Sequence, residues 1–189
     1  MVINMSETRK IALLGILSAI GAALMYIEIP ITFFSFLRID LSDVVVLVVF
    51  VTFGFKEGVM VAFVKSFIHF LFPGTNPTYG IGEIAAFIAS VTYIGGYYIA
   101  KNRLKLNKIH SAVFSIIVMS VLLTFLNWIV IAPVYYIFLY DSTYPDIFNW
   151  VYIDSIVSVF FPFNLIKGSV VFTVFYAVER SLNQYFQAN

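Results

Sequence analysis

The sequence lacks cysteine and has few charged residues. None of its 189 residues is cysteine, so disulfides and thiolate metal sites are excluded. Charged residues make up 11% of the chain, against about 25% in soluble proteins, and 61% of the residues are hydrophobic. The net charge is +1 and no basic stripe is present, which argues against nucleic-acid binding. This composition predicts an integral membrane protein.

Common catalytic and nucleotide-binding motifs are missing as well. The chain has no GxxxxGK[ST] phosphate-binding loop, so we do not expect it to hydrolyse ATP by itself. Gly-x-Ser-x-Gly and His-Glu-x-x-His are also absent. Asp40 and Asp43 could hold a divalent ion for phosphotransfer, but two acids at a membrane edge more often face water. We therefore expect neither an enzyme nor a metal site.

Hydrophobic segments predict six transmembrane helices, at roughly residues 11–28, 42–55, 57–72, 81–100, 109–139 and 150–180. Only twelve residues separate Asp43 from Lys56, so the second helix should be little tilted, buried among neighbours or extended outward through Leu41. The fifth is too long for a straight crossing, and Pro133 should bend its outer part. The expected fold class is an all-α membrane protein, with residues 1–189 forming a single transmembrane domain.

The distribution of lysine and arginine predicts the orientation in the membrane. With the N-terminus in the cytoplasm, only Arg38 lies outside, because cytoplasmic loops collect basic residues. The residues at the inner ends are Arg9, Lys10, Lys56, Lys101, Arg103, Lys105, Lys108 and Arg180. An even number of spans returns the chain to its starting side, so we expect both termini in the cytoplasm.

The most informative stretch, residues 161–168 (FPFNLIKG), lies inside the last hydrophobic segment and contains a lysine. Lys167 falls near the middle of the segment, too deep to reach either surface easily. An ammonium at that depth costs several kcal/mol, so it is first interpreted as lining a polar cavity. Asn164 and Lys167 share one helix face with Val171. We expect Pro162 to break the helix one turn above that face.

Other polar residues near the outer ends extend this candidate cavity. Asn127 lies at a depth comparable with that of Asn164, and either bonds a neighbouring helix or faces the cavity; we favour the cavity. Gly80 and Glu83 follow a polar, turn-rich stretch at 73–79, and a glycine entry exposes backbone N–H groups at a helix start. A plain tight turn remains the alternative there.

Three further features leave alternatives open. The aromatic loop at 29–41 either anchors in the headgroup region or forms a lid over a ligand. Lys65 and His69 are a structural pair or interact with Glu83 or another carboxylate. Small residues of the first span form a stripe that packs within the chain or docks another membrane protein. The stripe consists of Ala12, Gly15, Ser18, Ala19, Ala22 and Ala23.

These residues resemble a known family: the substrate-capturing S components of energy-coupling-factor (ECF) vitamin transporters, and in particular the riboflavin-specific members. The likeness covers the chain, including the small-residue first helix and residues 162–168 of the last. It implies a bacterial plasma-membrane protein that captures riboflavin outside the cell and needs no cofactor. It further implies partnership with a transmembrane coupling subunit (T component) and two cytoplasmic ATPases.

The resemblance also implies roles for particular residues. Gly15, Ala19 and Ala23 would form the docking face for the coupling subunit. Asn164 and Lys167 are ligand-binding residues by a motif match, and the other ligand contacts rest on location alone. Those others are Leu37, Ile39, Asp40, Thr78, Tyr79, Gly80, Glu83, Asn127 and Trp128.

Several other functions remain as alternatives. The substrate could be another vitamin, such as thiamine, biotin or folate. A stand-alone ion-coupled carrier would use Lys65, His69, Glu83 and Lys167 as relay groups, although no convincing inverted repeat is visible. A membrane enzyme would act on lipid phosphates through Asp40 and Asp43, but the usual additional acids and arginines are lacking.

Overall fold

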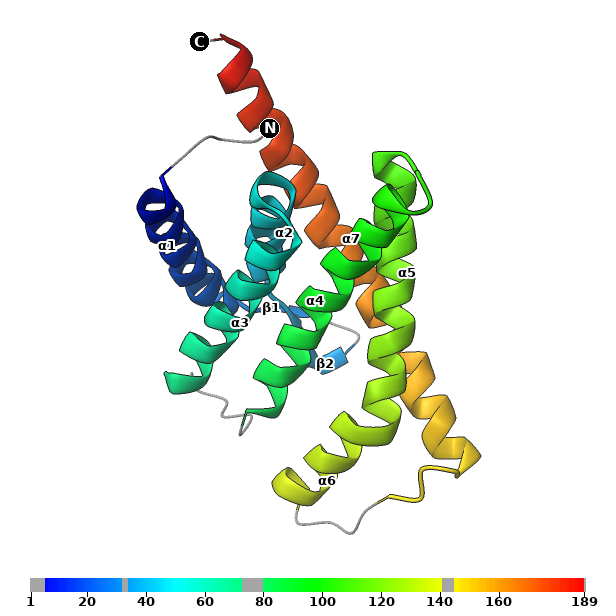
Figure 1. The fold of residues 1–189 in the computed structure, drawn as a ribbon. Helices are drawn as coiled ribbons and strands as arrows, with labels where there is room; N and C mark the ends of the chain where they lie inside the picture. The colour runs from blue at the N-terminus through cyan, green and yellow to red at the C-terminus, as the bar shows by residue number, and fades with distance from the viewer. Residues whose placement is uncertain (1–5, 32–33, 73–79, 141–144, 189) are drawn as a thin grey trace. The chain divides into compact units, whose positions relative to one another are not determined.

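A computed structural model of the chain describes residues 6–31, 34–72, 80–140 and 145–188, and its secondary structure is almost all helical, as predicted. Figure 1 shows helices α1 (Glu7–Met25), α2 (Ser42–Phe53), α3 (Phe55–Leu71), α4 (Ile81–Asn102), α5 (Lys108–Leu126), α6 (Ala132–Tyr140) and α7 (Trp150–Ala188). A π-helical turn, η1 (Asn127–Ile131), joins α5 to α6 without a break. Because α5, η1 and α6 are continuous, the described helices form six continuous helical segments.

A short hairpin departs from the predicted all-α fold. Strand β1 (Ile29–Ile31) pairs antiparallel with β2 (Phe34–Ile39), and Ile29 lies opposite Ile39. The sequence of β2, FSFLRI, is rich in aromatic and branched apolar residues, which favour strands, although adjacent Phe36 and Leu37 break a strict alternation. Sequence analysis expected a loop at 29–41, so the hairpin corrects that expectation, whereas the helical fold class is confirmed for the rest of the described chain.

Four helical stretches are long and apolar enough to cross a membrane, as expected of a membrane protein. They are Glu7–Met25, Ile81–Asn102, Lys108–Ile137 and Trp150–Ser181. Helix α2 is apolar but has only 12 residues. Most of its residues are buried, and it packs against α1 and α3. Of the three arrangements considered for this short helix, burial among its neighbours is confirmed.

The chain forms two compact units, residues 1–74 with 168–189 and residues 75–167. In the first unit α1, α2 and α3 pack against one another, and in the second α4 packs against α5. The contact between α4 and α5 is close, because a Cβ at Gly96 would lie 3.0 Å from the Cα of Ser115. The hydroxyl of Ser115 donates to the carbonyl of Tyr93 at the same crossing. The expected single domain stays a prediction.

Helix α7 runs through Pro162, so the predicted break at this residue is wrong. Proline lacks an N–H and removes one backbone hydrogen bond. Ending the helix there would leave several more backbone groups unsatisfied, which is costly in an apolar environment. A single proline is therefore accommodated within a helix of 39 residues.

The bend expected near Pro133 is present, and a π-helical turn directly precedes it. The N–H of Ala132 bonds the carbonyl of Asn127, five residues earlier, instead of the usual four. Pro133 follows directly and donates no backbone hydrogen bond. Figure 1 shows α6 leaving the line of α5 at this point. Proline and π-turns are both recognised causes of sharp helix bends.

Gly54 separates α2 from α3, and its replacement tests whether this junction needs glycine. Its φ of 121° and ψ of 179° lie in a region that is essentially restricted to glycine. We expect Gly54→Ala to destabilise the protein by about 1–3 kcal/mol, measured by thermal unfolding in detergent. Gly15→Ala is the control, since its added Cβ would meet no atom within 4 Å. Equal melting temperatures for the two variants would contradict this interpretation.

Candidate functional site

The two polar residues of the last-helix motif are buried, as the cavity hypothesis requires. Asn164 is 4% exposed and Lys167 is 8% exposed. The side-chain Nδ2 of Asn164 donates to the carbonyl of Phe160, 2.8 Å away and one turn earlier in α7. That bond uses one of the two amide hydrogens, and asparagine also carries an acceptor oxygen. Neither residue is turned outward, where it would face lipid.

Asn127 begins the π-helical turn and is 7% exposed. Its side-chain Nδ2 donates to the carbonyl of Leu123, at 2.8 Å. Its own carbonyl accepts from the N–H of Ala132. The amide therefore bonds its own helix, a possibility that sequence analysis did not consider. Because π-turns often occur at functional sites, this placement is consistent with a role at the predicted site.

Trp128 forms part of a clasp between η1 and the start of α7. The π-turn diverts the N–H of Ala132 away from the Trp128 carbonyl, and the hydroxyl of Tyr152 donates to that carbonyl at 3.1 Å. In return, the indole Nε1 of Trp128 donates to the carbonyl of Ile147 at 2.6 Å. Trp128 was predicted as a ligand contact, but its N–H is engaged within the protein. Sequence analysis missed Tyr152, which no motif marked.

An open pocket of about 310 Å³ lies beside this clasp. Its lining consists of Tyr136, Pro145, Asp146, Asn149, Val151, Tyr152 and Ser155. None of the predicted ligand-binding residues that the structure describes lines it.

The start of α4 carries two of the predicted contacts. Gly80 caps the helix with φ 85°, a left-handed conformation that glycine adopts without a steric penalty. Glu83 lies in the first turn and is 8% exposed. A carboxylate is favoured there by the partial positive charge of the helix N-terminus. Thr78 and Tyr79, which precede this turn, lie outside the described residues.

The end of the hairpin carries three predicted contacts. Ile39 is buried, and Leu37 is partly exposed. Asp40 follows β2 and accepts hydrogen bonds at Oδ1 from Ser42, from the backbone N–H at 3.0 Å and from the hydroxyl. These bonds fix the carboxylate at the start of α2.

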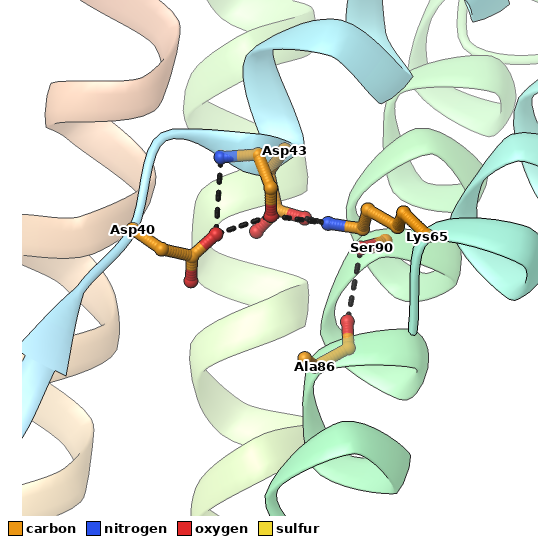
Figure 2. Close-up of polar contacts among 6 residues, drawn as sticks. Asp40, Asp43, Lys65, Ala86 and Ser90 are labelled. Atoms are coloured by element: carbon orange, nitrogen blue, oxygen red, sulfur yellow. Dashed lines mark hydrogen bonds and ion pairs between the residues drawn. The ribbon is translucent and has the colours of Figure 1, made fainter. Parts of the chain in front are cut away.

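A buried ion pair joins α2 to α3. The Nζ of Lys65 lies 2.7 Å from Oδ1 of Asp43, and the two side chains are 0% and 3% exposed. Figure 2 shows this contact. The interpretation of Asp43 as facing water is wrong, because Lys65 supplies a partner charge inside the protein. The expectation that Lys65 meets a carboxylate is confirmed, whereas His69 contacts Tyr26, with ring centroids 4.6 Å apart.

The described residues hold no cluster of three or more histidine, cysteine, aspartate or glutamate side chains suited to a metal ion.

The structure separates the small-residue stripe of α1 into two faces. Ser18 and Ala22 are buried, whereas Gly15, Ala19 and Ala23 are exposed. The three residues predicted to dock a partner therefore lie on the outward face of α1.

The chain is similar in sequence to a known protein family and to named members of it. The family model for the substrate-specific component of ECF transporters matches residues 9–179. Two similar proteins are the riboflavin transporter RibU of Staphylococcus aureus (strain TCH60) and the riboflavin transporter FmnP of Bacillus subtilis (strain 168). RibU is 34% identical over 95% of this chain and 93% of its own length. FmnP is 28% identical over 89% of each protein.

A solved structure shows the same fold. It was described under the heading "Structure and mechanism of the S component of a bacterial ECF transporter". The TM-score is 0.76 at 32% sequence identity, and the match covers 96% of this chain and 99% of the other. The similarity therefore extends along essentially the whole chain.

The clasp at Trp128 is testable with a matched pair of tryptophans. Trp128→Phe removes the indole donor to Ile147, so we expect a loss of stability of about 1 kcal/mol. Trp150→Phe is the control, because Trp150 is 81% exposed and its replacement should change stability by less than about 0.5 kcal/mol. Thermal unfolding followed by circular dichroism measures both. A control that loses as much stability as Trp128→Phe would refute the structural role of the indole bond.

Proposed function

Because the chain belongs to the family of substrate-specific components of ECF transporters, we propose that it captures riboflavin outside a bacterial cell and delivers it with a separate energy-coupling module. Riboflavin is favoured because RibU and FmnP, which match most of the chain, are both named riboflavin transporters. Members of this family are transporter components and not enzymes. The observation that carries the proposal is the burial of Asn164 and Lys167 within the last helix.

The chemistry of riboflavin suits these two residues. The vitamin has an apolar dimethylbenzene edge, a polar edge with an imide N–H and carbonyls, and a polyol tail. The Asn164 amide both donates and accepts, so it can pair with the imide edge. The Lys167 ammonium donates only, which suits a ring carbonyl or a ring nitrogen. Both groups are buried, and hydrogen bonds in a low-dielectric environment are stronger than in water.

We extend the ligand contacts to the other predicted residues. Leu37 and Ile39 offer apolar surface for the flavin ring, and Trp128 could contribute its ring face while its N–H donates to Ile147. The remaining contacts are polar or backbone groups. They are Asp40, Thr78, Tyr79, Gly80, Glu83 and Asn127.

The proposed topology is one domain in the plasma membrane with six crossings and both termini in the cytoplasm. Basic residues support this orientation, because Lys101, Arg103 and Lys105 are all exposed at the connection from α4 to α5. Helices α2 and α3 are short for a full crossing, with 12 and 17 residues. Both are apolar along much of their length, which suits helices shielded by longer neighbours.

The coupling partners that we propose are a transmembrane T component and two cytoplasmic ATPases. The chain has no phosphate-binding loop, so uptake driven by ATP hydrolysis needs another subunit to hydrolyse the ATP. Gly15, Ala19 and Ala23 form an exposed line of small residues on α1. Small residues let a second helix approach closely in a membrane, so this line is the proposed docking face.

Vitamin capture is tested by titrating the purified protein with riboflavin and following the quenching of flavin fluorescence. We expect Asn164→Ala and Lys167→Ala to weaken binding by about 1–3 kcal/mol each, because each removes a buried hydrogen-bonding group. Asn102→Ala and Lys101→Ala, which change exposed residues at the end of α4, should bind as the unchanged protein does. A protein that neither carries flavin absorption nor quenches added riboflavin would overturn the proposed substrate. Normal binding by both Asn164→Ala and Lys167→Ala would assign those residues structural roles.

The docking face is tested by separating binding from uptake. Ala19→Trp or Ala23→Trp should leave riboflavin binding unchanged and abolish uptake in cells that contain the coupling module, because the large ring keeps the partner helix away. Val121→Trp is the control, since Val121 is 55% exposed on a different helix. Loss of binding with normal membrane insertion would place this line in internal packing instead.

A further inference from the structure

A chain of hydrogen bonds runs from the buried Lys65 to the end of the β1–β2 hairpin. The Nζ of Lys65 lies 2.6 Å from Oγ of Ser42, and Ser42 Oγ in turn bonds Oδ1 of Asp40. These residues all belong to the unit formed by residues 1–74 with 168–189. Figure 2 shows Asp40, Asp43 and Lys65 converging at the start of α2.

Chemistry fixes the direction of each bond in this chain. An ammonium can only donate, and a serine hydroxyl has one proton. Since Lys65 donates to Ser42 Oγ, the single hydroxyl proton of Ser42 is directed to the Asp40 carboxylate. Hydrogen bonds that involve an ionised group are shorter and stronger than neutral ones. The charge of Lys65 therefore orients Asp40 through one intervening hydroxyl.

The anchor itself has little freedom to move. Lys65 and Ser42 are 0% exposed, and Asp43 is 2% exposed. The aliphatic part of Lys65 passes close to α1, because a Cβ at Gly21 would lie 3.4 Å from Lys65 Cβ and 3.5 Å from Lys65 Cδ. Its ammonium is held at a second point by Asp43, at 2.7 Å. A side chain that is packed along its stem and bonded at its tip is a rigid support for the bonds that follow.

We propose that Lys65 is a positioning residue for vitamin capture, and that it acts through Ser42 to hold Asp40 in the orientation that contacts riboflavin. The inference rests on the proposed function, and specifically on Asp40 as a ligand contact. It gives a role in binding to a lysine that the ligand itself need not touch. The Lys65–Asp43 pair then supports both the packing of α2 on α3 and the geometry of the hairpin end.

A double-mutant cycle in riboflavin affinity separates positioning from general stability. Ser42→Ala removes the bridging hydroxyl and keeps the Lys65–Asp43 pair, so we expect binding about 3- to 10-fold weaker, the size of one lost hydrogen bond. Asp40→Ala should weaken binding at least as much. The double variant, Ser42→Ala with Asp40→Ala, should bind riboflavin no worse than Asp40→Ala alone. Without the Asp40 carboxylate, the Ser42 hydroxyl has no group to position. Additive losses, together with lower melting temperatures, would show a merely structural role and overturn the proposal.

The ammonium is tested without leaving a lone buried charge. Lys65→Met combined with Asp43→Asn removes both charges, so the protein should retain a cooperative thermal transition and lose riboflavin affinity by at least as much as Ser42→Ala. Ser120→Ala is the matched control, because that buried hydroxyl donates to the Ile116 carbonyl one turn earlier in its own helix. The Ser120→Ala variant should bind riboflavin with the same affinity as the unchanged protein.

The outcomes distinguish this inference from the proposed function. If Asp40→Ala weakens binding while Ser42→Ala and the Lys65→Met/Asp43→Asn double variant bind normally, Asp40 does not depend on Lys65 and the inference is wrong. If Asp40→Ala binds normally, the inference is also wrong, but riboflavin capture by the unchanged protein stands. If the unchanged protein binds no riboflavin, the proposed function itself fails.

Discussion

The ion pair between Lys65 and Asp43 is the constraint around which the first unit is arranged. Both charges are buried, and either one alone would be destabilising by about 3–5 kcal/mol. The short α2 and the neighbouring α3 must therefore keep these residues opposite each other. The stem of Lys65 also lies beside Gly21 on α1, so α1, α2 and α3 meet around this side chain. A polar contact thus determines the packing of a largely apolar unit.

In the second unit, too, a polar group needs a hydrogen-bond partner. Here the group is the backbone carbonyl of Trp128, which loses its usual helical partner at the π-turn before Pro133. The Tyr152 hydroxyl satisfies the Trp128 carbonyl, and the Trp128 indole bonds the Ile147 carbonyl. In an apolar environment such groups cannot rely on water, so each bend needs a side chain to complete its hydrogen bonding. The bend and its clasp are therefore best regarded as one feature.

The sequence was sufficient to predict the helical class and the bend at Pro133, and burial among neighbours was one of the three arrangements it left open for α2. Each of these depends on hydrophobic patterning or on the backbone chemistry of proline, which are local properties. The hairpin at 29–39 was missed because its strands are short and aromatic residues have several possible roles at a membrane surface. The continuity of α7 through Pro162 was missed because the cost of unsatisfied backbone groups in lipid outweighs one lost bond.

For the site, the motif at 162–168 was sufficient to identify Asn164 and Lys167 as buried polar residues. The Lys65–Asp43 pair could not be assigned in advance, because the two residues are 22 positions apart and several acids were available. Tyr152 carried no signal at all, since its role depends on a carbonyl that only the π-turn releases. Contacts that depend on tertiary geometry were thus beyond sequence reasoning, whereas composition and spacing were informative.

The pairing of Lys65 with Asp43 also has an evolutionary consequence. Replacing either residue alone would leave an unpaired charge in the protein interior. The two positions are therefore expected to be substituted together or not at all. Among related sequences, an apolar residue at one of these positions should therefore accompany an uncharged residue at the other.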